Sequence, residues 1–170
     1  MKKSYISLTD YLIATMKPVI EYHPTYATEY QFYKMDANSI VKEKMYANDA
    51  FSQWLGIDVI EAGPGYCSLL MTVRKEMTNG FGIAHGGITY SLADSALAFA
   101  SNGHGHHALS IETSISHIKA VAIGDQLKAI AKEVAGSRKI GQYEVSIYNQ
   151  DNIMVAWFKG IVYKKEETWK

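Results

Sequence analysis

The sequence predicts one α+β domain in which an antiparallel sheet wraps around a single buried helix. Residues 86–101 form a small, apolar run with one formal charge, as expected for a helix that other structure encloses. Two strand patterns precede this run and four follow it, with turn residues between neighbours. Strands joined by short turns are expected to pair antiparallel, and one sheet around one helix is the simplest architecture that buries both.

Composition limits the classes of function. The chain has 170 residues, of which 48% are hydrophobic, enough for one domain with a proper core. Lys+Arg and Asp+Glu balance at 17 each, so no overall basic field attracts nucleic acid. Cys67 is the only cysteine, which fits a reducing cytoplasm. No window reaches the length of a transmembrane helix, and no continuous apolar stretch marks an export signal. We expect a cytoplasmic protein without nucleic-acid or membrane partners.

The first part of the chain differs from the rest. Residues 1–35 hold six of the twelve tyrosines and two of the three prolines, so we predict an N-terminal extension with a short helix that ends before Pro18. The main domain is expected over residues 36–170.

Each element of the main domain follows from a local pattern. Asp36 or Asn38 is expected to cap a first helix running to Trp54, with Phe51 and Trp54 closing its apolar stripe. Residues 75–84 form a glycine-containing loop into the central helix, which Asn102-Gly103-His104-Gly105 ends. Alternating β-branched residues and intervening turns predict strands at 57–62, 66–73, 107–119, 125–136, 140–150 and 153–164.

The central helix carries the main candidates for chemistry. Asp94 is the only formally charged residue between Glu76 and Glu112. A carboxylate is costly to bury without a partner, so it is either a structural acid satisfied by nearby donors or a reactive group. Gly86 and Gly87 stand at the helix start, where free N–H groups and the helix dipole favour a negative oxygen. This arrangement is suited to an oxyanion site built from backbone.

Other polar residues have a functional and a structural interpretation. The Asn79 amide could position a carbonyl or a water, or Asn79 could simply begin an Asn-Gly turn. His85 could act as a base, although no Ser or Cys nucleophile pairs with it in an obvious motif. Ser110 could help to hold a water. Arg138 and Lys139 at a turn are either solvated or suited to the phosphates of a nucleotide-bearing substrate.

Three histidines follow the central helix with the spacing H-x-H-H, at His104, His106 and His107. Neither an acid nor a cysteine lies near them in sequence, so an exposed loop is favoured over a metal site.

Together these residues resemble the phenylacetic-acid-degradation (PaaI-type) hotdog-fold acyl-CoA thioesterases. The resemblance rests on Asn79, then His85-Gly86-Gly87 six residues on, then Asp94 in the run Tyr-Ser-Leu-Ala-Asp-Ser-Ala-Leu-Ala-Phe-Ala. It extends over about residues 40–164. Further similar segments are Met45-Tyr-Ala-Asn-Asp-Ala-Phe, Leu55-Gly-Ile-Asp-Val-Ile, Ala122-Ile-Gly-Asp-Gln-Leu-Lys-Ala and the strand pair around 136–139.

The resemblance implies a hotdog fold, a dimer with composite active sites, and usually a tetramer of two dimers. The implied substrate is an acyl-CoA, with phenylacetyl- and hydroxyphenylacetyl-CoA as leading candidates, and no metal or prosthetic group is implied. Asp94 would be the general base or the nucleophile, and the Gly86 N–H would polarise the thioester carbonyl. Asn79 would face Asp94 from the partner subunit, with His85 and Ser110 in support. Substrate-binding positions are expected at Gly87, Phe81, Tyr90, Lys119, Arg138 and Lys139.

The chain departs from the family at Lys119-Ala120, where many relatives have Arg-Pro, and Glu112 is either a second acid or a solvated side chain. Two other functions stay open. A hotdog domain can bind acyl-CoA without turnover, and hotdog hydratases or dehydratases use a His with a differently placed carboxylate.

Overall fold

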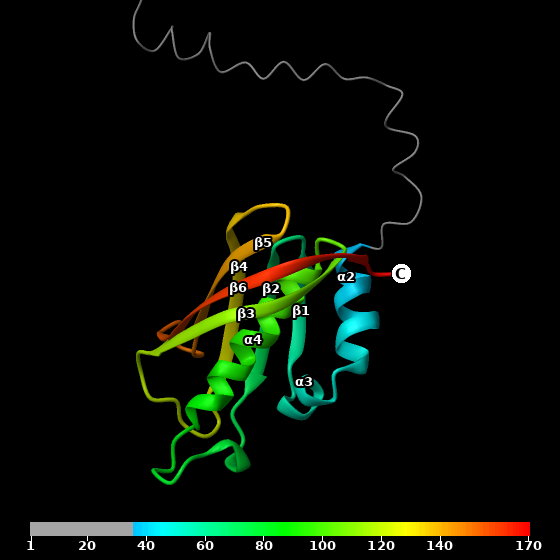
Figure 1. The fold of residues 1–170 in the computed structure, drawn as a ribbon. Helices are drawn as coiled ribbons and strands as arrows, with labels where there is room; N and C mark the ends of the chain where they lie inside the picture. Colours follow the sequence, from blue (N-terminus) through cyan, green and yellow to red (C-terminus); the bar gives the residue numbers. More distant parts are fainter. Residues whose placement is uncertain (1–35) are drawn as a thin grey trace, which may run out of the picture. The chain divides into compact units, whose positions relative to one another are not determined.

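The computed structural model describes residues 36–170, and the predicted extension 1–35 lies outside the described residues. Within the described part, six antiparallel strands form one sheet in the order β1-β2-β4-β5-β6-β3. The long helix α4 (Gly86–Asn102) packs against one face of the sheet, which curves around it (Figure 1). The predicted architecture is therefore confirmed. The strands are β1 (Asp58–Gly63), β2 (Tyr66–Thr72), β3 (His106–His117), β4 (Gln126–Gly136), β5 (Ile140–Tyr148) and β6 (Met154–Thr168).

The predicted strands agree with these bounds to within two residues except at the end of the last one, which continues to Thr168 instead of 164. Thr168 pairs with His106, so the end of β6 is held by the first residue of β3. Trp169 adds to this contact, because its indole N–H donates to the Asn102 side chain at 2.9 Å. A strand end that is fixed by pairing with a residue far away in the sequence has no local sequence pattern.

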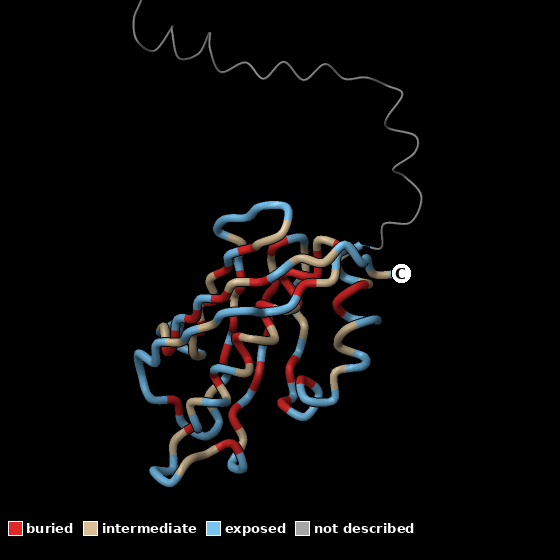
Figure 2. Tube along the Cα trace, viewed as in Figure 1, coloured by how far each residue is buried: buried red, intermediate tan, exposed pale blue. Residues whose placement is uncertain are grey.

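The core lies between α4 and the sheet, where buried residues of both face each other (Figure 2). One side of α4 is small and apolar, which lets the helix lie close to the strands. The closest approach is at Gly160 of β6, where an added Cβ would stand 2.5 Å from Leu97 Cδ2. The fully buried helix residues are Leu92, Ala93, Ala96, Leu97 and Ala100.

The first predicted helix is broken in two. Asp36 caps it as expected, since its carboxylate accepts a hydrogen bond from the Ser39 N–H. Asp49, however, has a non-helical backbone and accepts from the Ser52 N–H at 2.9 Å, which starts a new helix. The prediction of one helix to Trp54 was wrong because Asp is a good N-cap and a poor interior residue. The segments are α2 (Ala37–Ser39), a π-helical turn (Ile40–Met45), a 3-10 turn (Tyr46–Asn48) and α3 (Ala50–Leu55).

The break also changes which residues of this region are buried. Phe51 and Trp54 are 53% and 50% exposed and stack on each other, so they do not close an apolar stripe. Ile40, Val41 and Leu55 are fully buried in their place.

The histidines after α4 do not form the exposed loop that the sequence favoured. His104 pairs with Glu133 at 2.5 Å, and Lys164 contacts the same carboxylate at 2.9 Å, so favourable contacts hold the pKa of Glu133 below its ordinary value in spite of burial. His106 and His107 belong to β3. Within residues 36–170, no three His, Cys, Asp or Glu side chains are grouped so that they could hold a metal ion.

Among the described helices, none combines the length and hydropathy needed to cross a membrane.

The contact at Gly160 predicts a stability effect. Gly160→Ala is expected to lower the free energy of unfolding by about 1–3 kcal/mol, because Leu97 is fully buried and has no room to move. Gly63→Ala is the control, since no atom lies within 4 Å of its added Cβ, and should stay within about 0.5 kcal/mol of wild type. Urea denaturation of the three proteins measures this; equal effects at both glycines would contradict the close packing of β6 on α4.

Candidate active site

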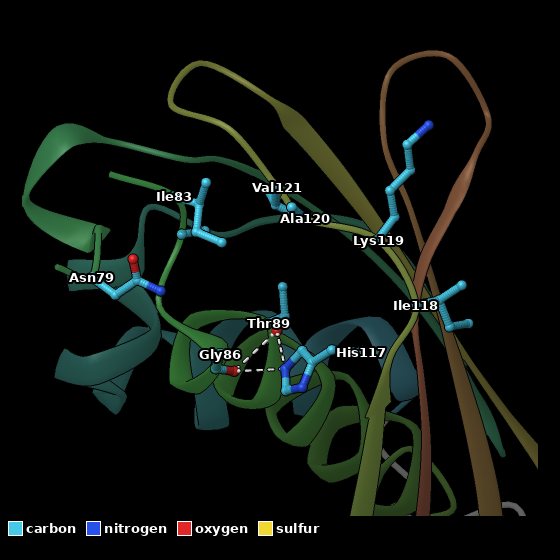
Figure 3. Close-up of a pocket in the computed structure, with 10 residues that line it drawn as sticks. Asn79, Ile83, Gly86, Thr89, His117, Ile118, Lys119, Ala120 and Val121 are labelled. Atoms are coloured by element: carbon cyan, nitrogen blue, oxygen red, sulfur yellow. Dashed lines mark hydrogen bonds between the residues drawn. The ribbon is translucent and has the colours of Figure 1, made fainter. Parts of the chain in front are cut away.

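A pocket of about 310 Å³ opens at the N-terminal end of α4 (Figure 3). Three segments line it: the loop that follows β2, the first turn of α4, and the end of β3 with the residues after it. The structure thereby brings together three of the predicted site residues, Asn79, Gly86 and Lys119. The lining is Asn79, Ile83, Ala84, Gly86, Thr89, His117, Ile118, Lys119, Ala120 and Val121.

Gly86, the first residue of α4, lines this pocket. His85 is the N-cap, and its Nδ1 accepts a hydrogen bond from the Gly87 N–H at 2.9 Å. Since Nδ1 is the acceptor, it carries no proton, and the neutral ring holds its proton on Nε2. Among the described residues no acceptor takes the Gly86 N–H. A free N–H at the positive end of a 17-residue helix is suited to a carbonyl oxygen that gains negative charge.

The Gly86 carbonyl on the other side of this residue is tightly held. It accepts from the Thr89 hydroxyl at 3.0 Å, and the His117 Nε2 lies 3.2 Å from it. His117 Nε2 also lies 2.9 Å from Thr89 Oγ1. Sequence reasoning missed both residues, because His117 and Thr89 stand 28 positions apart with no motif linking them.

Asn79 forms the turn that was one of its two interpretations. Its Oδ1 accepts from the Phe81 N–H at 2.9 Å, and the Gly82 N–H donates to its carbonyl, so a turn does form. The amide nitrogen is then the free end of the side chain, and it points into the pocket (Figure 3). The Asn79 amide is thus available to donate to a group in the pocket.

Asp94 lies outside this pocket. It is two turns along α4, half-buried, and burial raises the pKa of its carboxyl above the ordinary value. Among residues 36–170 no donor or cation contacts the carboxylate, so the alternative of a satisfied structural acid gains no support from the described part. Gly87, Ser91 and Ala98 lie on the same side of the helix, which the sheet leaves uncovered.

The other candidates lie at separate places. Phe81 is 91% exposed on the loop, so it is not core. Tyr90 packs edge-on against Phe158 and hydrogen-bonds to Thr113. Ser110 is exposed on the edge strand β3, next to a register shift.

Glu112 and Lys119 are also solvent-accessible. Glu112 forms an exposed ion pair with Lys159 at 3.4 Å, which favours the solvated alternative over a second catalytic acid. The Lys119 side chain extends away from Gly86 (Figure 3).

Arg138 and Lys139 lie near the C-terminal end of α4, not at the pocket. The structure links this turn to the helix end through Glu133, which contacts His104 just after α4. Lys139 pairs with Glu166 at 3.0 Å, and Arg138, 83% exposed, lies 3.9 Å from the same carboxylate. With His106, Lys164 and Lys165 they line a second pocket of about 240 Å³.

Comparison with known proteins agrees with this geometry. The thioesterase superfamily model matches residues 81–156, which span α4 and strands β3 to β5. A protein of Archaeoglobus fulgidus named as a putative esterase is 43% identical over 127 residues, which are 75% of this chain and 82% of the relative. The acyl-coenzyme A thioesterase PaaI of Escherichia coli is 39% identical over 116 residues, 68% of this chain and 83% of the relative.

The similarity holds in three dimensions. The solved structure of the Escherichia coli PaaI protein, from the phenylacetic acid degradation operon, superimposes with a TM-score of 0.75 and 35% identity. That match covers 78% of this chain and 96% of PaaI. With two relatives well above 30% identity and the same fold, the chain belongs to the thioesterase superfamily and, within it, to the PaaI-type hotdog-fold thioesterases.

Proposed function

We propose that this protein hydrolyses acyl-coenzyme A to a free acid and coenzyme A. The observation that carries the proposal is the Gly86 N–H at the start of α4, which has no acceptor among residues 36–170 and belongs to a residue that lines a pocket. The same helix bears the Asp94 carboxylate, which has no partner among the described residues. A thioester carbonyl is weakly stabilised by resonance, so one oriented donor, one carboxylate and one water can be sufficient for hydrolysis.

In the proposed reaction the thioester oxygen accepts from the Gly86 N–H, and the Asn79 amide holds the carbonyl or the water. Asp94 has one of two roles. As a base, it takes a proton from water, and the hydroxide attacks the carbonyl carbon. As a nucleophile, it forms a transient anhydride that water then hydrolyses. In both routes the C–S bond breaks and coenzyme A leaves as a thiolate that gains a proton. The steps need neither a metal nor a prosthetic group.

The proposal includes a second copy of the chain. Within one chain Asp94 does not line the Gly86 pocket, and the helix side that bears it is half-buried and not covered by the sheet. The edge strand β3 presents Leu109 and Ile111, 56% and 60% exposed. Pairing of two copies along this edge would cover these residues and place Asp94 of one copy beside Asn79 and Gly86 of the other. Two such dimers would form the tetramer.

For the substrate, we propose an aryl-acetyl-CoA such as phenylacetyl- or hydroxyphenylacetyl-CoA. The exposed Phe81 ring and the accessible Tyr90 ring offer aromatic surface to an aryl group. Arg138 and Lys139, from the basic pocket at the sheet end, would bind the coenzyme A phosphates. Cytoplasmic acyl-CoA is the expected source.

The first experiment measures thiol release from phenylacetyl-, hydroxyphenylacetyl-, benzoyl-, hexanoyl- and palmitoyl-CoA. Asp94→Asn is expected to lower kcat for the preferred ester by about 10²–10⁴-fold, the usual contribution of a general base. Asp151→Asn, a substitution on an exposed turn, should leave kcat unchanged. Cys67 will not disturb the thiol assay, because burial raises its pKa to about 12. Full activity of Asp94→Asn would exclude the proposed role, and binding without release would favour the non-catalytic module.

The raised pKa of Asp94 predicts how stability responds to pH. A carboxyl whose pKa is higher in the folded state favours folding while it is protonated, and this benefit is lost as pH rises through the folded pKa. Asp94→Asn should therefore be more stable than wild type at about pH 8, with a difference that shrinks as pH falls toward about 4. Denaturation curves across this range measure the difference. A variant less stable than wild type at about pH 8 would mean that the charged carboxylate has a favourable partner.

The phosphate role of Arg138 is tested with a truncated substrate. Arg138→Ala should raise KM for the coenzyme A ester by about tenfold, the effect of losing about 1.4 kcal/mol of phosphate binding. KM for the matching N-acetylcysteamine ester, which has no nucleotide, should not change. Lys128→Ala, on an exposed position of β4, is the charge control. An equal rise in KM for both esters would contradict a phosphate contact.

A further inference from the structure

The peptide bond between Gly86 and Gly87 is held at both of its polar ends. Its oxygen lies 3.0 Å from Thr89 Oγ1 and 3.2 Å from His117 Nε2, and its N–H donates to His85 Nδ1 at 2.9 Å. The two oxygen-side residues also contact each other, with 2.9 Å between His117 Nε2 and Thr89 Oγ1. Three side chains therefore converge on one peptide group at the start of α4. Figure 3 shows the two on the oxygen side, Thr89 and His117.

These three contacts fix where the protons lie. The Thr89 hydroxyl has one proton, and it donates this proton to the Gly86 carbonyl. Thr89 Oγ1 can then only accept from His117, which requires a proton on His117 Nε2. That nitrogen also faces the Gly86 carbonyl, and without a proton two acceptors would meet at 3.2 Å. His117 is thus a donor at Nε2, not a base that could activate the Thr89 hydroxyl.

The packing around these bonds is tight. A Cβ added at Gly86 would stand 3.1 Å from both Cε1 and Nε2 of His117, so the imidazole ring rests against the Gly86 backbone. Thr89 is only 3% exposed, which shields its hydrogen bonds from water. Since His117 is the last residue of β3, the contact joins the sheet to the first turn of the helix.

The location of this contact matters for the proposed reaction. Two consecutive glycines leave the backbone freer than any other pair, so the first turn of α4 needs outside contacts to hold one geometry. The Gly86 N–H belongs to the preceding His85–Gly86 peptide, whose oxygen accepts from the Ile88 N–H at 2.9 Å. Its direction relative to the held Gly86 carbonyl depends on the backbone geometry of Gly86, and a misdirected donor stabilises developing charge poorly.

We infer that His117 is a positioning residue for the thioester carbonyl: together with Thr89 it holds the Gly86 carbonyl and so aims the adjacent Gly86 N–H at the substrate oxygen. The inference rests on the proposed thioesterase function. It gives His117 an effect on the rate of the chemical step and little effect on substrate binding, because no atom of His117 needs to touch the substrate.

Three single variants and one double variant test this. His117→Phe keeps the ring against Gly86 but removes the donor, and Thr89→Val keeps the shape but removes the hydroxyl. Each is expected to lower kcat by about tenfold or more while KM stays within about twofold, since the donor acts mainly in the transition state. His117→Gln should restore most of kcat, because its amide N–H₂ reaches as far as the imidazole Nε2–H. The double variant Thr89→Val/His117→Phe should be no slower than the slower of the two single variants, because both side chains hold the same carbonyl.

Several results would overturn the inference: unchanged kcat in His117→Phe, no recovery in His117→Gln, or additive losses in the double variant. The outcome is separate from that of the proposed function, which depends on turnover by wild type and its loss in Asp94→Asn. If wild type releases no thiol, amide hydrogen exchange over the first turn of α4 decides the point. Faster exchange in His117→Phe and Thr89→Val, but not in His117→Gln, supports the positioning role, and equal exchange in all variants contradicts it.

Discussion

The burial of one side of α4 against the sheet is the constraint on which this domain depends. The buried side is formed mainly by alanines and leucines, and at Gly160 the strand lets Leu97 reach its backbone. Such close packing fixes the helix along its axis as well as across it. The first turn of α4 is consequently held at one place relative to the end of β3, where the pocket forms.

The same constraint explains why one helix carries both hydrogen-bonded polar groups and polar groups without a described partner. On the sheet side the buried residues of α4 are apolar or hydrogen-bonded, and this side provides the stability. On the uncovered side Asp94 has no described partner, and at the helix start Gly86 has a free N–H. Unsatisfied groups of this kind cost stability, and enzymes keep them where substrates will meet them. The well-packed side makes such a cost tolerable.

Most of the fold followed from the sequence because its patterns are local. The charge-poor run predicted α4 to within one residue, and turn residues located all six strands. The first helix was harder to predict, since Asp49 stands within a helically spaced run of apolar residues. Its role as an N-cap is visible only in the hydrogen bond that its side chain accepts from the Ser52 N–H. The end of β6 depends on pairing with β3, which no window of sequence contains.

The part of the site that could be predicted is the part formed by residues close together in the sequence. Gly86 and Asn79 met in one pocket because a helix start and the loop before it must lie together. His117 and Thr89 were missed because their contact exists only after β3 returns alongside the helix. Arg138 and Lys139 were correctly placed at a turn, but their shared neighbour Glu166 comes from another strand.

The strand order has a consequence for how this chain folds as it is made. β3 occupies an edge of the sheet, and its one partner among the described strands is β6, the last to be synthesised. Until residues 154–168 emerge from the ribosome, β3 has no neighbour to pair with, although it carries exposed isoleucine and leucine side chains. An unpaired apolar strand is open to association with other chains. The nascent protein therefore passes through an interval in which the strand that leads into the pocket wall is unpaired and open to association, and completion of β6 ends that interval.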